Sequence, residues 1–207
     1  MTKIKICGLM KKEDILTVNR FCPEYAGFII DFPKSHRSKT PEEVRELTGL
    51  LDASIVPVGV FVNRPKELIL ELLNDNIIRM AQLHGSEDDD YIRFLKENSG
   101  KPIIKAFVIK TKDDLLSAFH SSADEILLDA GYGSGESFDW GLLDDPLVIK
   151  QRRFFLAGGL NAENISAAIN NINPYAVDIS SGVETNRQKD PVKIERIINI
   201  IRNKEGV

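Results

Sequence analysis

The chain has 207 residues, of which 43% are hydrophobic and 28% are charged, a composition typical of a globular protein. Its formal charge is −4, with 27 basic residues spread among 31 acidic ones, so it lacks the clustered positive charge that binds a nucleic-acid backbone. Two cysteines are too few for a disulfide scaffold or a four-ligand zinc site, and we expect free thiols in a reducing cytoplasm. No apolar run approaches the roughly 18 residues of a membrane span, so a membrane is not an expected partner. The spread of charge likewise argues against a nucleic-acid partner.

Eight short apolar or β-branched runs recur along the chain and predict strands. They begin near residues 3, 25, 55, 80, 102, 125, 153 and 175. Stretches with helical spacing follow them at 12–21, 41–51, 65–75, 86–98, 111–122, 161–172 and 190–204. Proline or a capping residue with acidic neighbours marks several helix starts, such as Thr40-Pro41 and Asp190-Pro191.

The spacing of these elements indicates the fold class. Strand starts lie 22 to 30 residues apart, which fits one strand, one helix and two short loops. Eight βα units favour an α/β fold, the single (β/α)8 TIM barrel, for which about 200 residues is the compact end of the range. An open doubly wound sheet is the main alternative, but it more often has about five to seven strands and a glycine fingerprint that KICGLM lacks. No linker divides the chain, so residues 1–207 are expected to form one catalytic domain, with GYGSGES and DWGLL replacing a full helix in the sixth unit.

Polar residues stand where most of these runs end, and in such a barrel the active site lies at the carboxyl ends of the strands. The residues at these ends are Cys7, Asp31, Asn63, Gln82, His84, Asp129, Gly158, Gly159 and Asp178. Strands also end wherever burial ends, which places some polar groups there by chance. A thiol, a carboxylate, a histidine and two glycine-bearing turns together favour a site.

Two loops predict a phosphate site. AGGLNAEN, after the seventh run, has Gly158 and Gly159 before Asn161, a good N-cap, and DISSGVE supplies a second turn at Ser181 and Gly182. Loops without Cβ atoms let backbone N–H groups converge on an anion, and a helix N-terminus adds partial positive charge. These positions are also the recurring phosphate site of the barrel. The alternative is that the glycines only permit tight turns.

Cys7 and Asp129 would face each other across the barrel mouth. A free cysteine is usually a small buried hydrophobe, and its thiol becomes a useful base only where positive charge, here from Lys5 or Arg37, stabilises the thiolate. Asp129 ends an apolar strand, where a carboxyl group favours its neutral form and can act as a general acid; the alternative is a capping role at the turn. Cys22, at the close of the first helix, is expected to pack.

The remaining polar residues do not indicate a metal. No pair among the three histidines has metal-ligand spacing and no Cys or carboxylate cluster completes a site, so we predict no metal. The loop PKSHRSK is by default a solvated basic loop. Beside an active site, however, Arg37 would hold a carboxylate bidentately.

Six motifs in order resemble the phosphoribosylanthranilate isomerase family over nearly the whole chain. They are KICGL, FPKSHR, GVFVN with QLHG, ILLDAGYGSGESFDW, AGGLNAEN and DISSGVE. One departure is Tyr132-Gly133-Ser134-Gly135, which lacks one glycine of a run found in many members. The resemblance implies a cytoplasmic enzyme of tryptophan biosynthesis that rearranges a phosphosugar, N-(5′-phosphoribosyl)anthranilate, without a cofactor.

The resemblance also implies roles for individual residues. Cys7 would be the general base, Asp129 the general acid, and Arg37 the ligand of the anthranilate carboxylate. The further implied positions are Gln82 and His84 at the pocket wall, Gly158, Gly159, Ser181 and Gly182 around the phosphate, and Asp178 beside them. Two alternatives are a related histidine-pathway isomerase, thought to use two Asp, and a non-catalytic barrel that binds a phosphate ligand. We expect a monomer rather than a homodimer.

Overall fold

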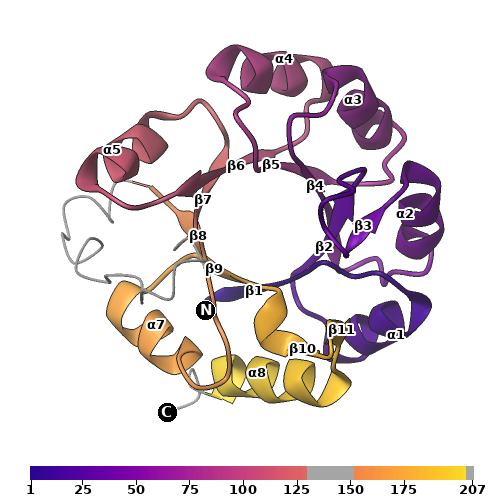
Figure 1. The fold of residues 1–207 in the computed structure, drawn as a ribbon, viewed down its shortest axis with the longest axis vertical. Helices are drawn as coiled ribbons and strands as arrows, with labels where there is room; N and C mark the ends of the chain where they lie inside the picture. The colour runs from indigo at the N-terminus through magenta and orange to yellow at the C-terminus, as the bar shows by residue number, and fades with distance from the viewer. Residues whose placement is uncertain (130–151, 204–207) are drawn as a thin grey trace.

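A closed ring of parallel strands forms the centre of the computed structural model, which describes residues 1–129 and 152–203 (Figure 1). Its strands are β1 (Lys3–Cys7), β2 (Tyr25–Ile30), β4 (Val56–Phe61), β5 (Met80–Leu83), β6 (Ile103–Val108), β7 (Glu125–Asp129), β8 (Phe154–Ala157) and β9 (Ala176–Ile179). Neighbours in this order are hydrogen-bonded, and β1 pairs with both β2 and β9. The predicted eight-stranded barrel is therefore confirmed, because an open sheet would leave its outermost strands unpaired.

Helices surround the ring on its outside (Figure 1). They are α1 (Lys12–Phe21), α2 (Pro41–Thr48), α3 (Lys66–Asn74), α4 (Asp89–Ser99), α5 (Lys112–His120), α7 (Ile165–Ile172) and α8 (Pro191–Asn203). Each lies within a predicted stretch or one residue beyond it. Among the described helices, none combines the length and apolar character needed to cross a membrane. The irregular sixth unit, GYGSGES with DWGLL, lies outside the described residues.

The start of α7 differs from the prediction. The helix begins at Ile165 rather than near Asn161. Asn161 still closes the turn that leads into it, because its Oδ1 accepts from the backbone N–H of Glu163 at 2.9 Å and its carbonyl accepts from Ile165 N at 3.0 Å. The N-terminus of α7 therefore lies about one helical turn farther from Gly158 and Gly159 than predicted.

The strands bury two different faces. Outward residues such as Ile4 and Ile6 join the larger apolar cluster, which contains the buried faces of the helices. A second cluster consists only of strand residues, and these fill the barrel interior. Its buried members are Tyr25, Val58, Met80, Ile104, Ala106, Leu127, Phe155, Ala157 and Ala176. Because side chains alternate along a strand, this interior set shows which neighbouring positions also point into the barrel.

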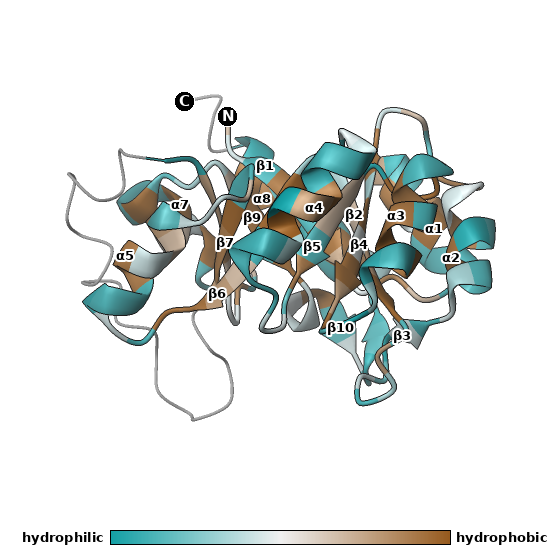
Figure 2. Cartoon of the chain, turned by 90° about the horizontal axis from the view of Figure 1, so that it is seen from above, coloured by the Kyte–Doolittle hydropathy of each residue, from teal (hydrophilic) through white to brown (hydrophobic). Residues whose placement is uncertain are grey.

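Short elements at the carboxyl ends of the strands were not predicted. β3 (Ser38–Lys39) pairs in parallel with the end of β2. β10 (Glu184–Thr185) pairs with β11 (Gln188–Lys189) in a hairpin that follows the 3-10 helix η2 (Ser181–Val183). β3 and β10 lie at one end of the barrel, opposite the N-terminus (Figure 2). The hairpin therefore stands at the end where a barrel enzyme holds its substrate.

Candidate active site

Cys7 and Asp129 both point into the barrel at the carboxyl ends of their strands. Cys7 pairs in register with Gly27, two residues beyond the interior Tyr25, and Asp129 lies two residues beyond the interior Leu127. Side chains two residues apart on a strand share a face. The fold therefore brings a thiol and a carboxyl group that are 122 positions apart to the same end of one interior.

The thiol of Cys7 lies beside a buried ammonium group. A Cβ atom on Gly27 would fall 2.8 Å from Cys7 Sγ and 3.0 Å from Lys5 Nζ, so the absence of a side chain at Gly27 leaves the room that both groups occupy. Lys5 is fully buried, and its Nζ donates to both carboxylate oxygens of Asp178, at 2.9 and 3.0 Å. A buried ammonium group is costly unless it is paired, and Asp178 supplies that partner.

Burial and charge act in opposite directions on this group of residues. Burial raises the pKa of the Cys7 thiol above its ordinary value, while the positive charge of Lys5 lowers it in part. For Lys5, burial lowers the pKa, but the charge of Asp178 and its hydrogen bonds with Lys5 oppose burial, and the pKa is raised. Lys5 is therefore charged at neutral pH, and the resting form of Cys7 is the thiol.

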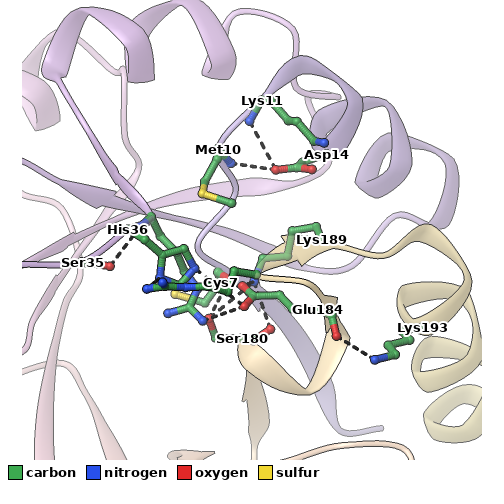
Figure 3. A network of polar contacts seen from close by, with 12 residues as sticks. Cys7, Met10, Lys11, Asp14, Ser35, His36, Ser180, Glu184, Lys189 and Lys193 are labelled. Carbon is green, nitrogen blue, oxygen red and sulfur yellow. Dashed lines mark hydrogen bonds and ion pairs between the residues drawn. The ribbon is translucent and has the colours of Figure 1, made fainter.

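A second charged group lies next to Cys7 and comes from two separate loops (Figure 3). Glu184 of β10 accepts from Arg37 Nε and Nη2, both at 2.7 Å, and from Lys189 Nζ at 2.7 Å. Lys189 Nζ also donates to the carbonyl of Ser180 at 3.0 Å, and Ser180 Oγ donates to the carbonyl of Cys7 at 3.1 Å. The loop that contains Arg37 is thereby joined to the end of β1 and to the hairpin.

The charges of the two groups do not cancel. Three basic side chains, Lys5, Arg37 and Lys189, pair with two carboxylates, Asp178 and Glu184, so basic groups outnumber acidic ones in these pairs, although burial lowers the pKa of Lys189. The interactions with Arg37 and Lys189 outweigh burial and hold the pKa of Glu184 at about 2, well below its ordinary value. A local excess of positive charge suits an anionic ligand, although the whole chain has a net charge of −4.

Asp129 lies close to one of the two predicted wall residues, His84, and Gln82 contacts His84 in turn. His84 Nε2 lies 3.5 Å from Asp129 Oδ2, and Gln82 Nε2 lies 3.3 Å from His84 Nδ1. Among the described residues, the buried Gln82 Oε1 has no hydrogen-bond partner. The three side chains are linked through His84 at the carboxyl ends of β5 and β7.

The two predicted phosphate loops touch each other. Gly158 and Gly159 have φ values of 97° and 65°, which side-chain-bearing residues rarely adopt. A Cβ atom on Gly182 would overlap the backbone carbonyl oxygen of Leu160, so the turn at η2 packs directly on the loop after β8. Ser181 begins η2. The glycines therefore permit tight turns and let the two loops pack closely. The structure is compatible with both interpretations of these loops, a phosphate site and glycines that serve only the turns.

Some predictions differ from the structure or were missed. Cys22 is exposed rather than packed, because it ends α1 with φ 47° and its Sγ donates to the carbonyl of Asn19. Lys5 was predicted only as a source of charge, and its ion pair with Asp178 was missed. The alternation in KIKIC could have shown that Lys5 shares a strand face with Cys7. Glu184 and Lys189 were missed, because only the hairpin brings them to the site. The described residues contain no group of three His, Cys, Asp or Glu suited to a metal ion.

A (β/α)8 barrel with a thiol and a carboxyl group facing one interior, beside loops suited to a phosphate, is typical of the barrel enzymes that act on phosphosugars. The family model described as N-(5′-phosphoribosyl)anthranilate isomerase matches residues 4–200. This chain belongs to that family.

Individual relatives agree with the family over their full length. The N-(5′-phosphoribosyl)anthranilate isomerase of Endomicrobium trichonymphae is 45% identical over 208 residues, which cover 98% of this chain and 100% of that protein. The crystal structure of the phosphoribosylanthranilate isomerase from Thermotoga maritima is 35% identical with a TM-score of 0.87 and covers 100% of both chains. Another crystal structure of such an isomerase, in complex with reduced 1-(o-carboxyphenylamino)-1-deoxyribulose 5-phosphate, is 34% identical with a TM-score of 0.86 and covers 98% of this chain and 100% of that one.

Proposed function

We propose that this chain converts N-(5′-phosphoribosyl)anthranilate to 1-(o-carboxyphenylamino)-1-deoxyribulose 5-phosphate in tryptophan biosynthesis, with Asp129 as general acid and Cys7 as general base. The observation that carries the residue roles is that both side chains face one barrel interior at the carboxyl ends of β7 and β1. The reaction is an internal redox isomerisation: C1′ of the ribose is reduced while C2′ is oxidised. Atoms and electrons balance without a cofactor.

The first step is opening of the ribose ring. Protonated Asp129 donates its proton to the ring oxygen as the bond from that oxygen to C1′ breaks, and the anilinic nitrogen becomes a Schiff base. His84, 3.5 Å away, holds the carboxyl group toward the interior. A positioned acid of this kind contributes on the order of 10²–10⁴ in rate.

The second step is removal of the proton from C2′. The Cys7 thiolate takes this proton, and the electron pair moves through C1′ to the nitrogen, which gives an enolamine that tautomerises to the ketone. Burial makes the thiolate a stronger base but also a rarer one, since it raises the pKa of Cys7. Lys5 stabilises the small thiolate population that reacts.

Anchoring at both ends orients the bonds that break. We propose that Gly158, Gly159, Ser181 and Gly182 bind the phosphate through backbone N–H groups and that Arg37 binds the anthranilate carboxylate. Asp178, which we predicted to contact substrate, holds Lys5 in this structure, and its proposed part is to keep that ammonium beside Cys7. Holding the reacting atoms in place is an effect separate from proton transfer.

The experiment that tests this function is turnover by two variants. Cys7→Ala and Asp129→Asn should each lower kcat by about 10³-fold or more, because each removes one proton-transfer group. Product affinity, measured by fluorescence titration, should stay within severalfold of wild type. Cys22→Ser, which removes the exposed thiol, and Asp75→Asn, which removes an exposed carboxylate, are matched controls that should keep full activity.

Two outcomes would contradict these roles. A loss of product affinity with little loss of kcat would make the residue a binding group instead of a proton donor or acceptor. Wild-type turnover of the histidine-pathway substrate, with none of the anthranilate substrate, would favour that related isomerase, and turnover of neither would favour a binding barrel.

Assembly and location remain predictions. The Thermotoga maritima relative is a dimeric protein of which monomers have been generated. We propose that this chain acts in the cytoplasm as a monomer, since packing on the barrel accounts for the buried apolar faces of its helices. Sedimentation equilibrium would decide the assembly state, and a dimer would overturn this proposal.

A further inference from the structure

The guanidinium group of Arg37 is held along one of its two forked edges. Nε donates to Glu184 Oε1 and Nη2 donates to Glu184 Oε2, both at 2.7 Å. A guanidinium has five N–H donors, and a second fork lies between Nη1 and the other hydrogen of Nη2. Within residues 1–129 and 152–203, no hydrogen bond involves Nη1. One edge of Arg37 is therefore used inside the protein and the other remains able to bind a carboxylate.

Glu184 is itself fixed in place. Its side chain is 6% exposed, and Lys189 Nζ, buried with it, donates to Oε1 at 2.7 Å. Lys189 is in turn bonded to the Ser180 carbonyl, so the position of Glu184 is set by the end of β9 and by the β10–β11 hairpin. With a pKa of about 2, Glu184 is ionised throughout the neutral range.

Arg37 is confined from the opposite side as well. A Cβ atom on Gly8 would overlap Cδ of Arg37, so the arginine stem packs against the backbone that follows Cys7. Its side chain is only 19% exposed, although it belongs to a loop. A long side chain held at its stem and along one edge loses little further freedom when a ligand binds the second edge.

We propose that Glu184 is a positioning residue for substrate specificity: it holds Arg37 by the Nε edge so that the Nη1 edge receives the carboxylate of the substrate. This inference rests on the proposed function, because it takes anthranilate as the group bound. The opposite role would be a competitor that occupies Arg37 until the substrate displaces it. The two roles predict opposite changes in KM when Glu184 is removed.

The test compares two substrates that differ only in the carboxylate. They are N-(5′-phosphoribosyl)anthranilate and N-(5′-phosphoribosyl)aniline, and the readout is the ratio of their kcat/KM values for wild type, Glu184→Gln and Glu184→Ala. We expect Glu184→Gln to raise KM for the anthranilate substrate about tenfold, or ~1.4 kcal/mol, with kcat little changed. The specificity ratio should fall by the same factor, because the aniline substrate does not use Arg37. Removing a negative charge on electrostatic grounds alone would favour the anthranilate substrate, which carries one more negative charge, so it would raise this ratio and cannot account for the expected fall.

Two further variants provide controls. Glu71→Gln removes an exposed carboxylate that pairs with Arg45 outside the site, and it should leave both substrates unaffected. In an Arg37→Ala background, which alone raises KM for the anthranilate substrate, Glu184→Gln should cause little further change, because residues that act through one another are not additive. Thermal unfolding of each variant establishes that it is folded, and Glu184→Gln, nearly the same shape as glutamate, is the variant on which the test relies.

Several outcomes would overturn the inference. A lower KM for the anthranilate substrate in Glu184→Gln would identify a competitor, and an equal loss on both substrates would identify a purely structural residue. A full effect of Glu184→Gln in the Arg37→Ala background would show that Glu184 acts elsewhere. Wild-type protein that converts neither compound would instead refute the proposed function itself.

Discussion

The inner face of β1 carries two polar residues of the site, Lys5 and Cys7. Lys5 and Cys7 alternate with Ile4 and Ile6, so one strand has two apolar residues facing the helices and a charged residue and a thiol facing the interior. Interior positions of a barrel are usually filled by apolar side chains. A buried lysine at this position costs free energy unless it is paired. The ion pair with Asp178 offsets that cost. The ammonium group of Lys5 is therefore held next to Cys7, the proposed base.

Replacement of Lys5 tests this effect on the thiol. In a Cys22→Ser background, where Cys7 is the single thiol, Lys5→Met should move the Cys7 titration to higher pH, since burial remains and the stabilising charge is lost. Thiolate absorbance in the ultraviolet measures that titration. The rise of kcat/KM with pH should move in the same direction, because the thiolate is the reactive form.

Lys110→Met, at an exposed lysine, is the control and should leave the titration in place. The substitution at Lys5 also removes the partner of Asp178, so circular dichroism must first show a folded protein; an Asp178→Asn change in the same chain relieves the unpaired carboxylate. A thiol titration that stays at its wild-type pH in folded Lys5→Met would mean that Lys5 has no influence on Cys7. The double variant should shift less, because the charge of Asp178, which raises the pKa of Cys7, is lost as well.

At the level of elements, hydropathy patterns sufficed for the barrel but not for its added pieces. The eight strands that close the ring were predicted because each is a compact apolar run. The bounds of α1 were predicted to the residue because its helical spacing begins at Lys12 and ends at Phe21, shortly before Pro23. The β10–β11 hairpin has two-residue strands and turns at Asn186 and Arg187, both with positive φ. Such a turn usually contains glycine, so the sequence ETNRQK gave no sign of it.

The site residues also divide into those that the sequence predicted and those that it did not. Cys7 and Asp129 lie at strand ends, and a strand end can be located from the sequence. Glu184 and Lys189 reach the site through pairing between short segments and through an ion pair with Arg37, 147 positions away. Contacts of that kind depend on which loops the closed barrel brings together, and no local pattern records them.

The hairpin should contribute to stability in a pH-dependent way through Glu184. The folded pKa of Glu184 is about 2, below its ordinary value of 4.5, so the unfolded chain takes up the proton first as pH falls. Its contribution is fully present above pH 4.5 and is lost progressively as pH falls toward 2. The difference in unfolding free energy between wild type and Glu184→Gln, measured in urea, should therefore shrink from pH 6 to pH 3.

A second glutamate separates this effect from general acid destabilisation. Glu71 pairs with Arg45 at 4.0 Å and is largely exposed, so Glu71→Gln should differ little from wild type at either pH. A Glu184→Gln difference that is constant from pH 3 to pH 6 would mean that ionisation of this carboxylate does not stabilise the fold.

Across the whole molecule, barrel closure assembles the site from both ends of the chain. β1 pairs with β9 in register from Lys3 with Ala176 to Ile6 with Ile179, and this pairing sets Lys5 opposite Asp178. The neighbouring pair β8 and β9 places the loop after β9 beside the loop after β8, where Gly182 packs on Leu160. The loop after β9 contains η2 and leads into the β10–β11 hairpin, and its contact with the loop after β8 is backbone packing at Gly182. A ligand that binds both loops should therefore stabilise the folded state of the entire barrel.

Inorganic phosphate is the simplest such ligand. It should stabilise the folded wild-type protein by RT ln(1 + [phosphate]/Kd), about 2.7 kcal/mol at 100 times Kd, and so raise its melting temperature. Gly182→Ala should reduce or abolish this increase, since a methyl group there would push the two loops apart. Gly100→Ala is the matched control: Gly100 has φ +62° and nothing within 4 Å of its added Cβ, so alanine should lower the melting temperature through backbone strain yet retain the phosphate response. Equal responses in the two variants would show only the general stabilisation that phosphate gives to folded proteins, and would remove the loops after β8 and β9 as the phosphate site.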